Sequence, residues 1–417
     1  NMHRILRKIR IATFPSTVLI ATAVFQSESP KVSAKAITME QAEAKPSKEI
    51  EPNNALVAKQ PPSEVVMVTG GCGFLGQHIV KLLHERGDGV KEIRVFDKKP
   101  YIKELDYAEE KPMVTIVGDV TDARQVEEAL KGVDAVIHTA GLISYGTFPD
   151  EEGMEQINVK GTENIINGCI KKKVERLIYT STVDVVIGYE DIINGEESTT
   201  AIPRRFLFPG YPASKYKAEC NVLSAHMNKL HDSDKRLLSL SLRPNVMYGE
   251  MDPYYVTTSI KGAKENGGTL PRVGNGRAKF QQAYVGNVAW AHICANEALK
   301  SAPSIGGKPY FITDDTPIQN TFTFMEPFLK LHGYSVSRYY LPYWVVYAGF
   351  YTLESILWAI QPVKKIHLDS CLCSIIYINH DIYFNGGQAR NKLGYKPVFN
   401  PQEAIEKSAK YYAEIKV

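Results

Sequence analysis

The sequence has little cysteine and almost no excess charge of either sign. Its six cysteines include no CxxC pair, and Cys371 and Cys373 are too close in sequence for easy bridging, so neither a disulfide framework nor a metal site is expected. The 49 Lys and Arg nearly balance the 46 Asp and Glu, which excludes the strongly basic surface of a nucleic-acid-binding protein. No internal repeat is visible. These absences leave an ordinary globular protein of a mostly reducing environment, with 44% hydrophobic and 23% charged residues.

The first 63 residues do not have the pattern of a folded domain. Residues 1–27 combine a basic start with a short apolar stretch, which is typical of a secretory signal or of a mitochondrial presequence. An unstructured tail is the third interpretation. Residues 28–63 are rich in Ser, Lys, Glu, Ala and Pro, which predicts a linker.

From residue 64 onward, short apolar runs alternate with segments of helical periodicity. Strands are expected at 65–68, 92–97, 114–117, 135–138, 176–180 and 237–243, and helices at 74–86, 123–130, 154–171 and 211–230. This alternation predicts an α/β fold, a doubly wound parallel sheet of the Rossmann type, over residues 64–250. Residues 251–417 are expected to form a smaller substrate-binding lobe, with some segments, such as 284–315, returning to the first domain.

A glycine-rich turn, TGGCGFLG at 69–76, joins the first expected strand to the first helix. Gly70 permits the tight turn, Gly73 lets backbone amides approach a pyrophosphate, and Gly76 lets the helix pack on the strand. The positive end of the helix dipole then faces the phosphates. The turn therefore predicts a dinucleotide site. The residues expected to contact the cofactor there are Gly70, Gly71, Gly73, Phe74, Leu75, Asp97, Lys98, Asp119, Val120 and Ala140, together with Tyr211 and Lys215.

The acidic residue that ends the second strand bears on which dinucleotide is bound. Asp97 would bind the adenosine ribose hydroxyls and repel a 2′-phosphate, which favours NAD over NADP. Lys98 would partly relieve that repulsion, so NADP stays possible. Asp119 closes the third strand, where it either accepts a hydrogen bond from the adenine amine or only caps a turn.

The segment YPASK places Tyr211 and Lys215 four residues apart at the start of a helix. Side chains at this spacing project from one helix face and reach the same ligand. A nearby ammonium and the nicotinamide charge would lower the pKa of the phenol, which makes it a base for an alcohol proton. Thr180-Ser181-Thr182, at the end of the preceding strand, supplies a hydroxyl to hold the substrate oxygen.

Taken together, the motifs resemble the extended short-chain dehydrogenase/reductase superfamily. The motifs that carry this resemblance are TGGCGFLG, HTAG at 138–141, NVKGT at 158–162, YTST, YPASK and LRPNVMYG at 242–249. Two later blocks, YVGNVAWAH at 284–292 and FITDDTP at 311–317, are similar to the 3β-hydroxysteroid dehydrogenase/Δ5-Δ4 isomerase family and its sterol-4α-carboxylate 3-dehydrogenase relatives. The resemblance runs from Val65 to the C-terminus.

This resemblance implies roles for individual residues. Tyr211 is the proton acceptor, Lys215 binds ribose, and Thr182 takes a hydroxyl position at which many relatives have Ser. Asn158 is expected to order backbone or water beneath the cofactor, in a structural or a catalytic role. A pair of carboxylates, Asp314 and Asp315, either shuttles a proton during double-bond migration or only forms an Asx turn. We favour the Asx turn.

One stretch, 341–360, is nearly continuous in apolar and aromatic residues. It is just long enough to span a bilayer, but Glu354 near its middle would cost roughly 2.5–3.5 kcal/mol there. Its Trp and Tyr content suits the membrane interface better. An interfacial or re-entrant membrane-associated helix, a true span and a helix that walls the substrate pocket all stay open.

The sequence therefore predicts an NAD-preferring oxidoreductase that oxidises the 3β-hydroxyl of a steroid or sterol, with Δ5-Δ4 isomerisation as a hypothesis. A decarboxylating sterol-4α-carboxylate 3-dehydrogenase is the first alternative. A nucleotide-sugar epimerase or dehydratase and a non-catalytic cofactor-binding protein are the others. The expected partners are the steroid and a membrane surface, without nucleic acid. The endoplasmic reticulum membrane is the expected location, with a mitochondrial membrane as the alternative, and a homo-oligomer is compatible with the sequence.

Overall fold

The computed structural model describes residues 61–416. The predicted targeting segment at 1–27 and all but the last three residues of the predicted linker lie outside the described residues.

A seven-stranded parallel sheet forms the centre of the molecule. Its strands lie in the order β11-β7-β5-β4-β1-β2-β3, and every neighbouring pair is parallel. The strands are β1 (Glu64–Thr69), β2 (Val90–Asp97), β3 (Met113–Val117), β4 (Ala135–His138), β5 (Arg176–Thr180), β7 (Leu238–Pro244) and β11 (Pro309–Ile312). The order reverses between β1 and β4, which is where a doubly wound sheet opens a ligand crevice at its carboxyl edge. The predicted Rossmann-type α/β fold is confirmed.

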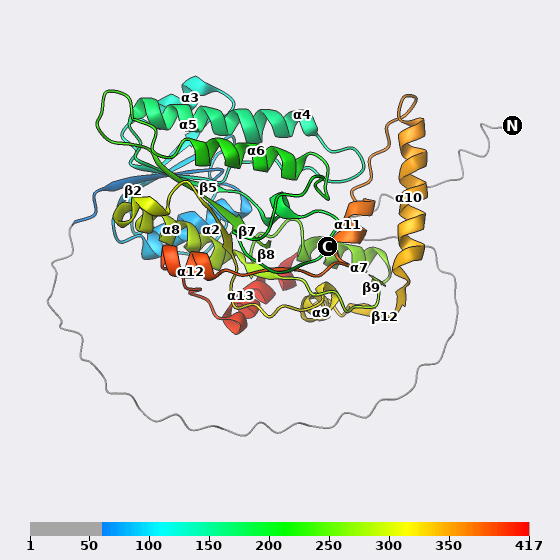
Figure 1. Ribbon diagram of the computed structural model, residues 1–417. Helices are drawn as coiled ribbons and strands as arrows, with labels where there is room; N and C mark the ends of the chain where they lie inside the picture. Colours follow the sequence, from blue (N-terminus) through cyan, green and yellow to red (C-terminus); the bar gives the residue numbers. More distant parts are fainter. Residues whose placement is uncertain (1–60, 417) are drawn as a thin grey trace.

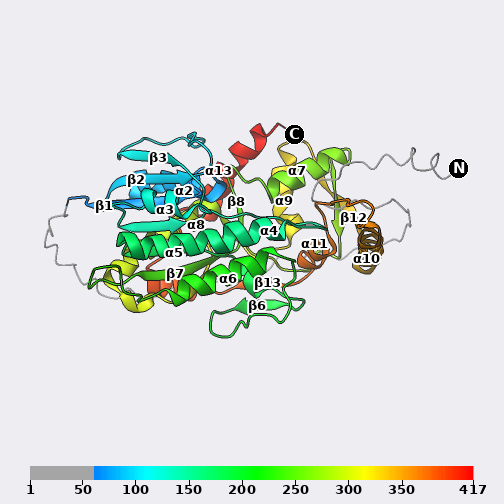
Figure 2. The ribbon, with the colours of Figure 1, turned by 90° about the horizontal axis from the view of Figure 1, so that it is seen from above.

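Helices cover both faces of this sheet, as Figures 1 and 2 show. On one face lie α3 (Ala123–Ala129), α5 (Gly161–Lys172) and α6 (Tyr211–Ser224), and on the other lie α2 (Phe74–Arg86) and α8 (Val285–Ser301). Each face has its own core, because apolar side chains on successive strand positions point to opposite sides. The segments α8 and β11 belong to this central body although they follow residue 250.

The remaining elements form a smaller lobe at the carboxyl edge of the sheet. They include three two-stranded pairs, β8 (Val246–Tyr248) with β10 (Gln282–Tyr284), β9 (Thr269–Val273) with β12 (Ser335–Leu341), and β6 (Ile192–Gly195) with β13 (Ile382–Phe384). The helices there are α7 (Val256–Glu265), α9 (Thr321–Lys330), α10 (Tyr343–Ile360), α11 (Leu372–Tyr377) and α13 (Pro401–Glu414), whereas α12 (Gly387–Leu393) packs against α8 and β11 of the central body.

Two helices differ from the expectation. The helix expected over 211–230 ends at Ser224, because the following backbone pairs with the chain leading into β7, Met227 N donating to Leu237 O at 2.7 Å. The helix expected over 154–171 is instead a short α4 (Glu151–Met154), one π-helical turn at Glu155–Lys160, and α5. A π-turn inside a helix often marks a functional site.

The apolar stretch at 341–360 forms α10, which stands at one end of the molecule in Figure 1. Within residues 61–416, no helix has the length and apolar character that crossing a bilayer requires. Glu354 points inward, and its Oε1 accepts a hydrogen bond from Leu372 N at 2.6 Å, which ties α10 to α11. Most large side chains of α10 are exposed, so the helix is not mainly a pocket wall.

Candidate active site

The glycine-rich turn has the geometry that close approach of a ligand backbone requires. Gly70 has φ +70°, and a Cβ added there would lie 2.7 Å from the backbone of Ala140. A Cβ on Gly76 would lie 2.2 Å from Gly70 O. Helix α2 begins at Phe74 behind Gly73, which has no side chain to cap the first amides, so these amides remain available to an anion. This part of the chain fits a pyrophosphate.

The residues expected around the adenosine lie along the same edge of the sheet. Asp97 ends β2, and its carboxylate accepts hydrogen bonds from Cys72 N and Lys99 N, both at 3.0 Å, so it is held beside the glycine-rich turn. Lys98 is exposed. The carboxylate of Asp119 accepts from Thr121 N at 2.8 Å, which is the expected turn contact and leaves its other oxygen for a base. The side chain of Val120 is buried in the core.

The first turn of α6 carries the two residues of the YPASK motif. Gly210 precedes it with φ +72°, and Pro212 occupies the first turn, where a missing N–H costs nothing. Tyr211 and Lys215 are both buried, at 7% and 5% exposed. The Lys215 ammonium lies 4.3 Å from the centre of the Tyr179 ring on β5. No described residue accepts a hydrogen bond from it, so it has donors available for a ribose.

Thr182 lies between the end of β5 and a short 3-10 turn at Val183–Val186. Its Oγ1 accepts a hydrogen bond from Asp184 N at 3.2 Å, and its hydroxyl also hydrogen-bonds the Asp184 carboxylate. Thr182 is 9% exposed. The loop between β5 and α6 thus brings a hydroxyl donor and the Tyr211 phenol to the same edge of the sheet.

The acidity of the Tyr211–Lys215 pair differs from the sequence expectation. Burial and the charge of Asp184 raise the pKa of Tyr211 above its ordinary value. Burial lowers the pKa of Lys215 to about 7, against a smaller opposing effect of Glu219. Among the described residues, burial and the Asp184 charge therefore outweigh any acidifying effect of the ammonium on the phenol. The predicted lowering needs the positive nicotinamide ring beside the phenol.

Asn158, in the π-helical turn, joins the loop after β4 to α6. Its Oδ1 accepts from Leu142 N at 2.7 Å, and its Nδ2 donates to Leu142 O and to Ser214 Oγ, both at 2.9 Å. The side chain is 1% exposed. These bonds order backbone beside Lys215, which fits the structural role, and the catalytic role stays a prediction.

The two carboxylates expected near the steroid point to different places. Asp314 is buried, and it accepts hydrogen bonds from Tyr284 N at 2.8 Å, Thr316 N at 2.9 Å and Asn287 Nδ2 at 3.0 Å. The Thr316 bond is that of the Asx-turn alternative. Asp315 is exposed and pairs with Arg390 on α12 at 2.8 Å. Neither carboxylate contacts Tyr211, Lys215 or Thr182 within the described residues.

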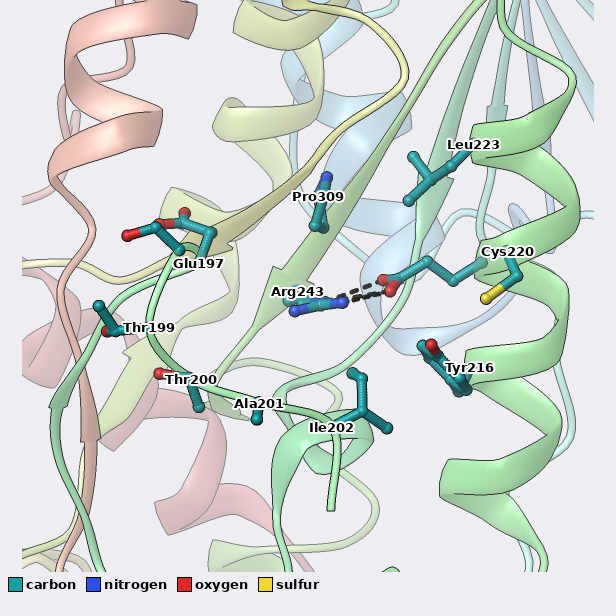
Figure 3. Close-up of a pocket in the computed structure, with 12 residues that line it drawn as sticks. Glu197, Thr199, Thr200, Ala201, Ile202, Tyr216, Cys220, Leu223, Arg243 and Pro309 are labelled. Carbon is teal, nitrogen blue, oxygen red and sulfur yellow. Dashed lines mark hydrogen bonds and ion pairs between the residues drawn. The ribbon is translucent and has the colours of Figure 1, made fainter. Parts of the chain in front are cut away.

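A buried ion pair that the sequence did not reveal fixes α6 to the sheet. Glu219, one turn beyond Lys215, accepts from Arg243 on β7 at 3.0 Å, and both are almost fully buried. Both residues line a cavity of about 410 Å³ that is bounded by α6 and by the loop after β6. Figure 3 shows Arg243 in this cavity with its ion pair as dashed lines. Neither Tyr211 nor Lys215 lines that cavity, so it is separate from the candidate active site. Only the fold brings residues 219 and 243 together.

A cluster of one carboxylate and two tyrosines, which the sequence analysis did not predict, lies next to Thr182. The Asp184 carboxylate accepts hydrogen bonds from Tyr145 Oη at 2.9 Å and from Tyr377 Oη at 3.3 Å. These residues are 39 and 193 positions apart from Asp184, so no local motif could have pointed to them.

A comparison with models of protein families matches most of this chain to a family of known enzymes. The model of the "3-beta hydroxysteroid dehydrogenase/isomerase family" matches residues 67–343, which include the glycine-rich turn, Thr182 and the first turn of α6. The chain belongs to this family. Among its curated relatives, 3 beta-hydroxysteroid dehydrogenase type 7 of Mus musculus is 34% identical over 83% of this chain and 94% of its own length. The Homo sapiens protein of the same name is 32% identical over 82% and 93%.

Solved structures show the same fold at low identity. A UDP-galactose 4-epimerase has a TM-score of 0.59 at 17% identity, covering 84% of this chain and 99% of its own. The dTDP-glucose 4,6-dehydratase DesIV of Streptomyces venezuelae, with NAD and DAU bound, has a TM-score of 0.57 at 21% identity, covering 84% and 97%. Family membership makes the chain an NAD-dependent oxidoreductase, and the predicted cofactor NAD is confirmed.

Proposed function

We propose that the protein oxidises the 3β-hydroxyl of a steroid or sterol to a ketone. The observation that carries this proposal is the placement of a buried phenol and a buried ammonium, Tyr211 and Lys215, on the first turn of α6, at the edge of the sheet where Thr182 follows β5. The printed names of the curated relatives support a 3β-hydroxysteroid as the substrate class.

In the proposed reaction, the substrate hydroxyl accepts a hydrogen bond from Thr182 Oγ1 and lies against the Tyr211 phenol. Bound NAD supplies the hydride acceptor and a positive ring. Tyr211 takes the hydroxyl proton as general base, and Lys215 holds the ribose and stabilises the phenolate. The residues around Gly70 and α2 would hold the pyrophosphate, and Asp97 the ribose hydroxyls.

Isomerisation of the resulting 3-oxo-Δ5 steroid to the conjugated 3-oxo-Δ4 product is the second half of the proposed function. The family's printed name, which includes an isomerase, supports it. The same name favours this activity over a decarboxylating sterol-4α-carboxylate dehydrogenase. The epimerase and dehydratase structures are similar at 17–21% identity, which supports a shared fold and not a shared substrate.

We also propose that α10 docks on a membrane surface, as suits a substrate that partitions into lipid. Four aromatic side chains on this helix are exposed: Trp344, Tyr347, Tyr351 and Trp358. Two exposed lysines, Lys364 and Lys365, follow its C-terminal end. Trp and Tyr on an apolar face with adjacent lysines are typical of helices that lie in the headgroup region of anionic bilayers. The endoplasmic reticulum is the proposed location, with a mitochondrial membrane as the alternative.

Product analysis with two parallel substrates tests the proposed activity. The full protein is incubated with NAD and either a Δ5-3β-hydroxysteroid or a 4-carboxysterol, and the reduced cofactor and the products are measured. We expect NADH formation and a 3-ketone from the first substrate. Turnover and decarboxylation of only the second would contradict the proposal, as would NAD binding without turnover of either.

A further inference from the structure

One buried carboxylate beside the candidate active site has no role in the oxidation. Asp184 follows Thr182 by two residues, at the carboxyl edge of β5, and is 6% exposed. Its two oxygens accept hydrogen bonds from two phenols, Tyr145 Oη on Oδ2 at 2.9 Å and Tyr377 Oη on Oδ1 at 3.3 Å. The Thr182 hydroxyl also hydrogen-bonds this carboxylate, so three donors leave one of its four lone-pair sites for a substrate.

This carboxylate lies close to the groups that would hold the steroid oxygen. The backbone N of Asp184 donates a hydrogen bond to Thr182 Oγ1 at 3.2 Å. The ring of Tyr145, which binds it, packs edge-on against the ring of Tyr211, with centroids 5.3 Å apart. Its charge also contributes to the raised pKa of Tyr211. In the proposed function, a substrate held by Thr182 and Tyr211 through its C3 oxygen would have its neighbouring ring carbons on the side of the site where Asp184 lies.

The surroundings of Asp184 are aromatic. Phe208 packs against both phenol rings, at 5.0 Å from Tyr145 and 5.2 Å from Tyr377, and Phe280 packs against Tyr377 at 4.9 Å. Burial raises the pKa of Asp184, although the hydrogen bonds from the two phenols oppose the effect. A carboxylate that is desolvated in this way is a stronger base than one in water.

The other carboxylate pair is less suited to proton transfer. Asp314 receives three hydrogen bonds that join β10, α8 and the turn at Thr316, and Asp315 is exposed in an ion pair with Arg390. Removing a proton from a ring carbon needs a base that faces the substrate. Among these carboxylates, Asp184 is the one next to Tyr211 and Thr182.

We infer that Asp184 is the catalytic base that moves the double bond, carrying a proton from C4 to C6 of a 3-oxo-Δ5 steroid. This inference rests on the proposed function, of which it names the second step. The carboxylate takes the C4 proton, and the C–H electron pair forms a dienolate whose oxygen accepts hydrogen bonds from Thr182 and the reprotonated Tyr211. The protonated Asp184 then returns the proton to C6, a C4=C5 bond forms, and the C3 carbonyl is restored. The step consumes no oxidant and no net proton.

The arrangement matches the general requirements of this chemistry. An Asp base combined with a tyrosine that donates to the steroid oxygen is an established way to run ketosteroid isomerisation. Tyr145 and Tyr377 hold the carboxylate in place through hydrogen bonds, which preserves its position when it changes charge.

The test supplies the 3-oxo-Δ5 steroid directly, with NADH, and follows the conjugated enone in D184N, D184E, D314N and D315N. We expect D184N to lose about 100-fold or more of the enone rate, the scale of a general base, and D184E to recover part of it. The exposed D315N is the matched control and keeps its rate. With a substrate deuterated at C4, the wild-type protein transfers label to C6, and D184N lowers the fraction transferred.

Several results would overturn the assignment. The first is an enone rate in D184N within threefold of the wild-type rate. The second is a loss of enone rate confined to D314N or D315N. The third is an equal loss of oxidation and isomerisation in D184N, which would make Asp184 a positioning residue for Tyr211. If D184N does not fold, as judged by NAD binding, the variants D184E and Y377F replace it. An unchanged enone rate and unchanged label transfer in both variants would then overturn the proposal. Because this assay starts from the ketone, it tests Asp184 independently of the oxidation step. Failure of the wild-type protein to oxidise a 3β-alcohol would contradict the proposed function and not the assignment of Asp184.

Discussion

Lys215 is a buried cation that has no acceptor of its own among the described residues. Its pKa is lowered to about 7 because burial disfavours the ammonium. A dinucleotide whose ribose and phosphates favour the ammonium would raise that pKa again. Binding of NAD and protonation of Lys215 are therefore linked.

This linkage predicts that the affinity for NAD depends on pH. Below pH 7 the free protein already carries the ammonium, so the affinity should be constant. Above pH 7 binding must take up a proton, and the affinity should fall by up to about tenfold per pH unit. Calorimetry in buffers of different ionisation enthalpy measures this proton uptake. K215R, which remains charged, should lose the dependence, and a pH-independent wild type would contradict the linkage.

Glycine at position 76 is a second residue-scale requirement, since a Cβ there would meet Gly70 O at 2.2 Å. We expect G76A to abolish or strongly weaken NAD binding, because the turn must move away from the helix. G349A is the matched control, since a Cβ at Gly349 in α10 meets nothing within 4 Å. Fluorescence titration with NADH compares the two variants, and equal affinities would show that the turn is not the binding site.

At the scale of the element, the position of α6 depends on the Glu219–Arg243 pair. Removing one partner leaves the other charge buried, so R243M should destabilise the protein by about 3–5 kcal/mol. Replacing both, in E219L/R243M, should recover much of this loss. Urea unfolding measures the free energies. If R243M unfolds like the wild type, the pair does not anchor α6.

The elements also show what the sequence could and could not predict. The bounds of α2, β4 and β5 follow from periodicity and glycine positions, and the helix over 211–230 was too long because a tertiary backbone pairing ends it at Ser224. Local motifs indicated the glycine-rich turn, Tyr211 and Lys215. The Asp184 cluster could not be predicted, because Tyr145 and Tyr377 reach it only through the fold. The raised pKa of Tyr211 depends on burial, which no motif encodes.

At the scale of the whole molecule, α10 links a surface to the active-site region. Its inward Glu354 binds α11, which ends at Tyr377, and its Trp358 packs edge-on against Phe148, three residues after Tyr145. A membrane contact at the exposed face of α10 would therefore lie next to the two segments that carry the tyrosines of the Asp184 cluster, the loop after β4 and α11.

The exposed aromatic side chains of α10 should determine binding to lipid. Trp344 and Tyr351 are 72% and 60% exposed, so W344S/Y351S removes apolar surface without opening the core. We expect this variant to lose most of its binding to anionic vesicles in a flotation assay while it keeps its affinity for NAD. The control is I193S, which removes an exposed apolar side chain on β6. Equal flotation of both variants would contradict docking through α10.

The measurement that bears most directly on the proposed chemistry is a single-turnover hydride transfer in Y211F. The phenylalanine keeps the ring that packs against Tyr145 and removes only the hydroxyl that takes the proton. With a Δ5-3β-hydroxysteroid and NAD, we expect the rate of NADH formation to fall by about 10²–10⁴-fold, with the affinity for NAD unchanged. Hydride transfer at the wild-type rate in Y211F would contradict the account.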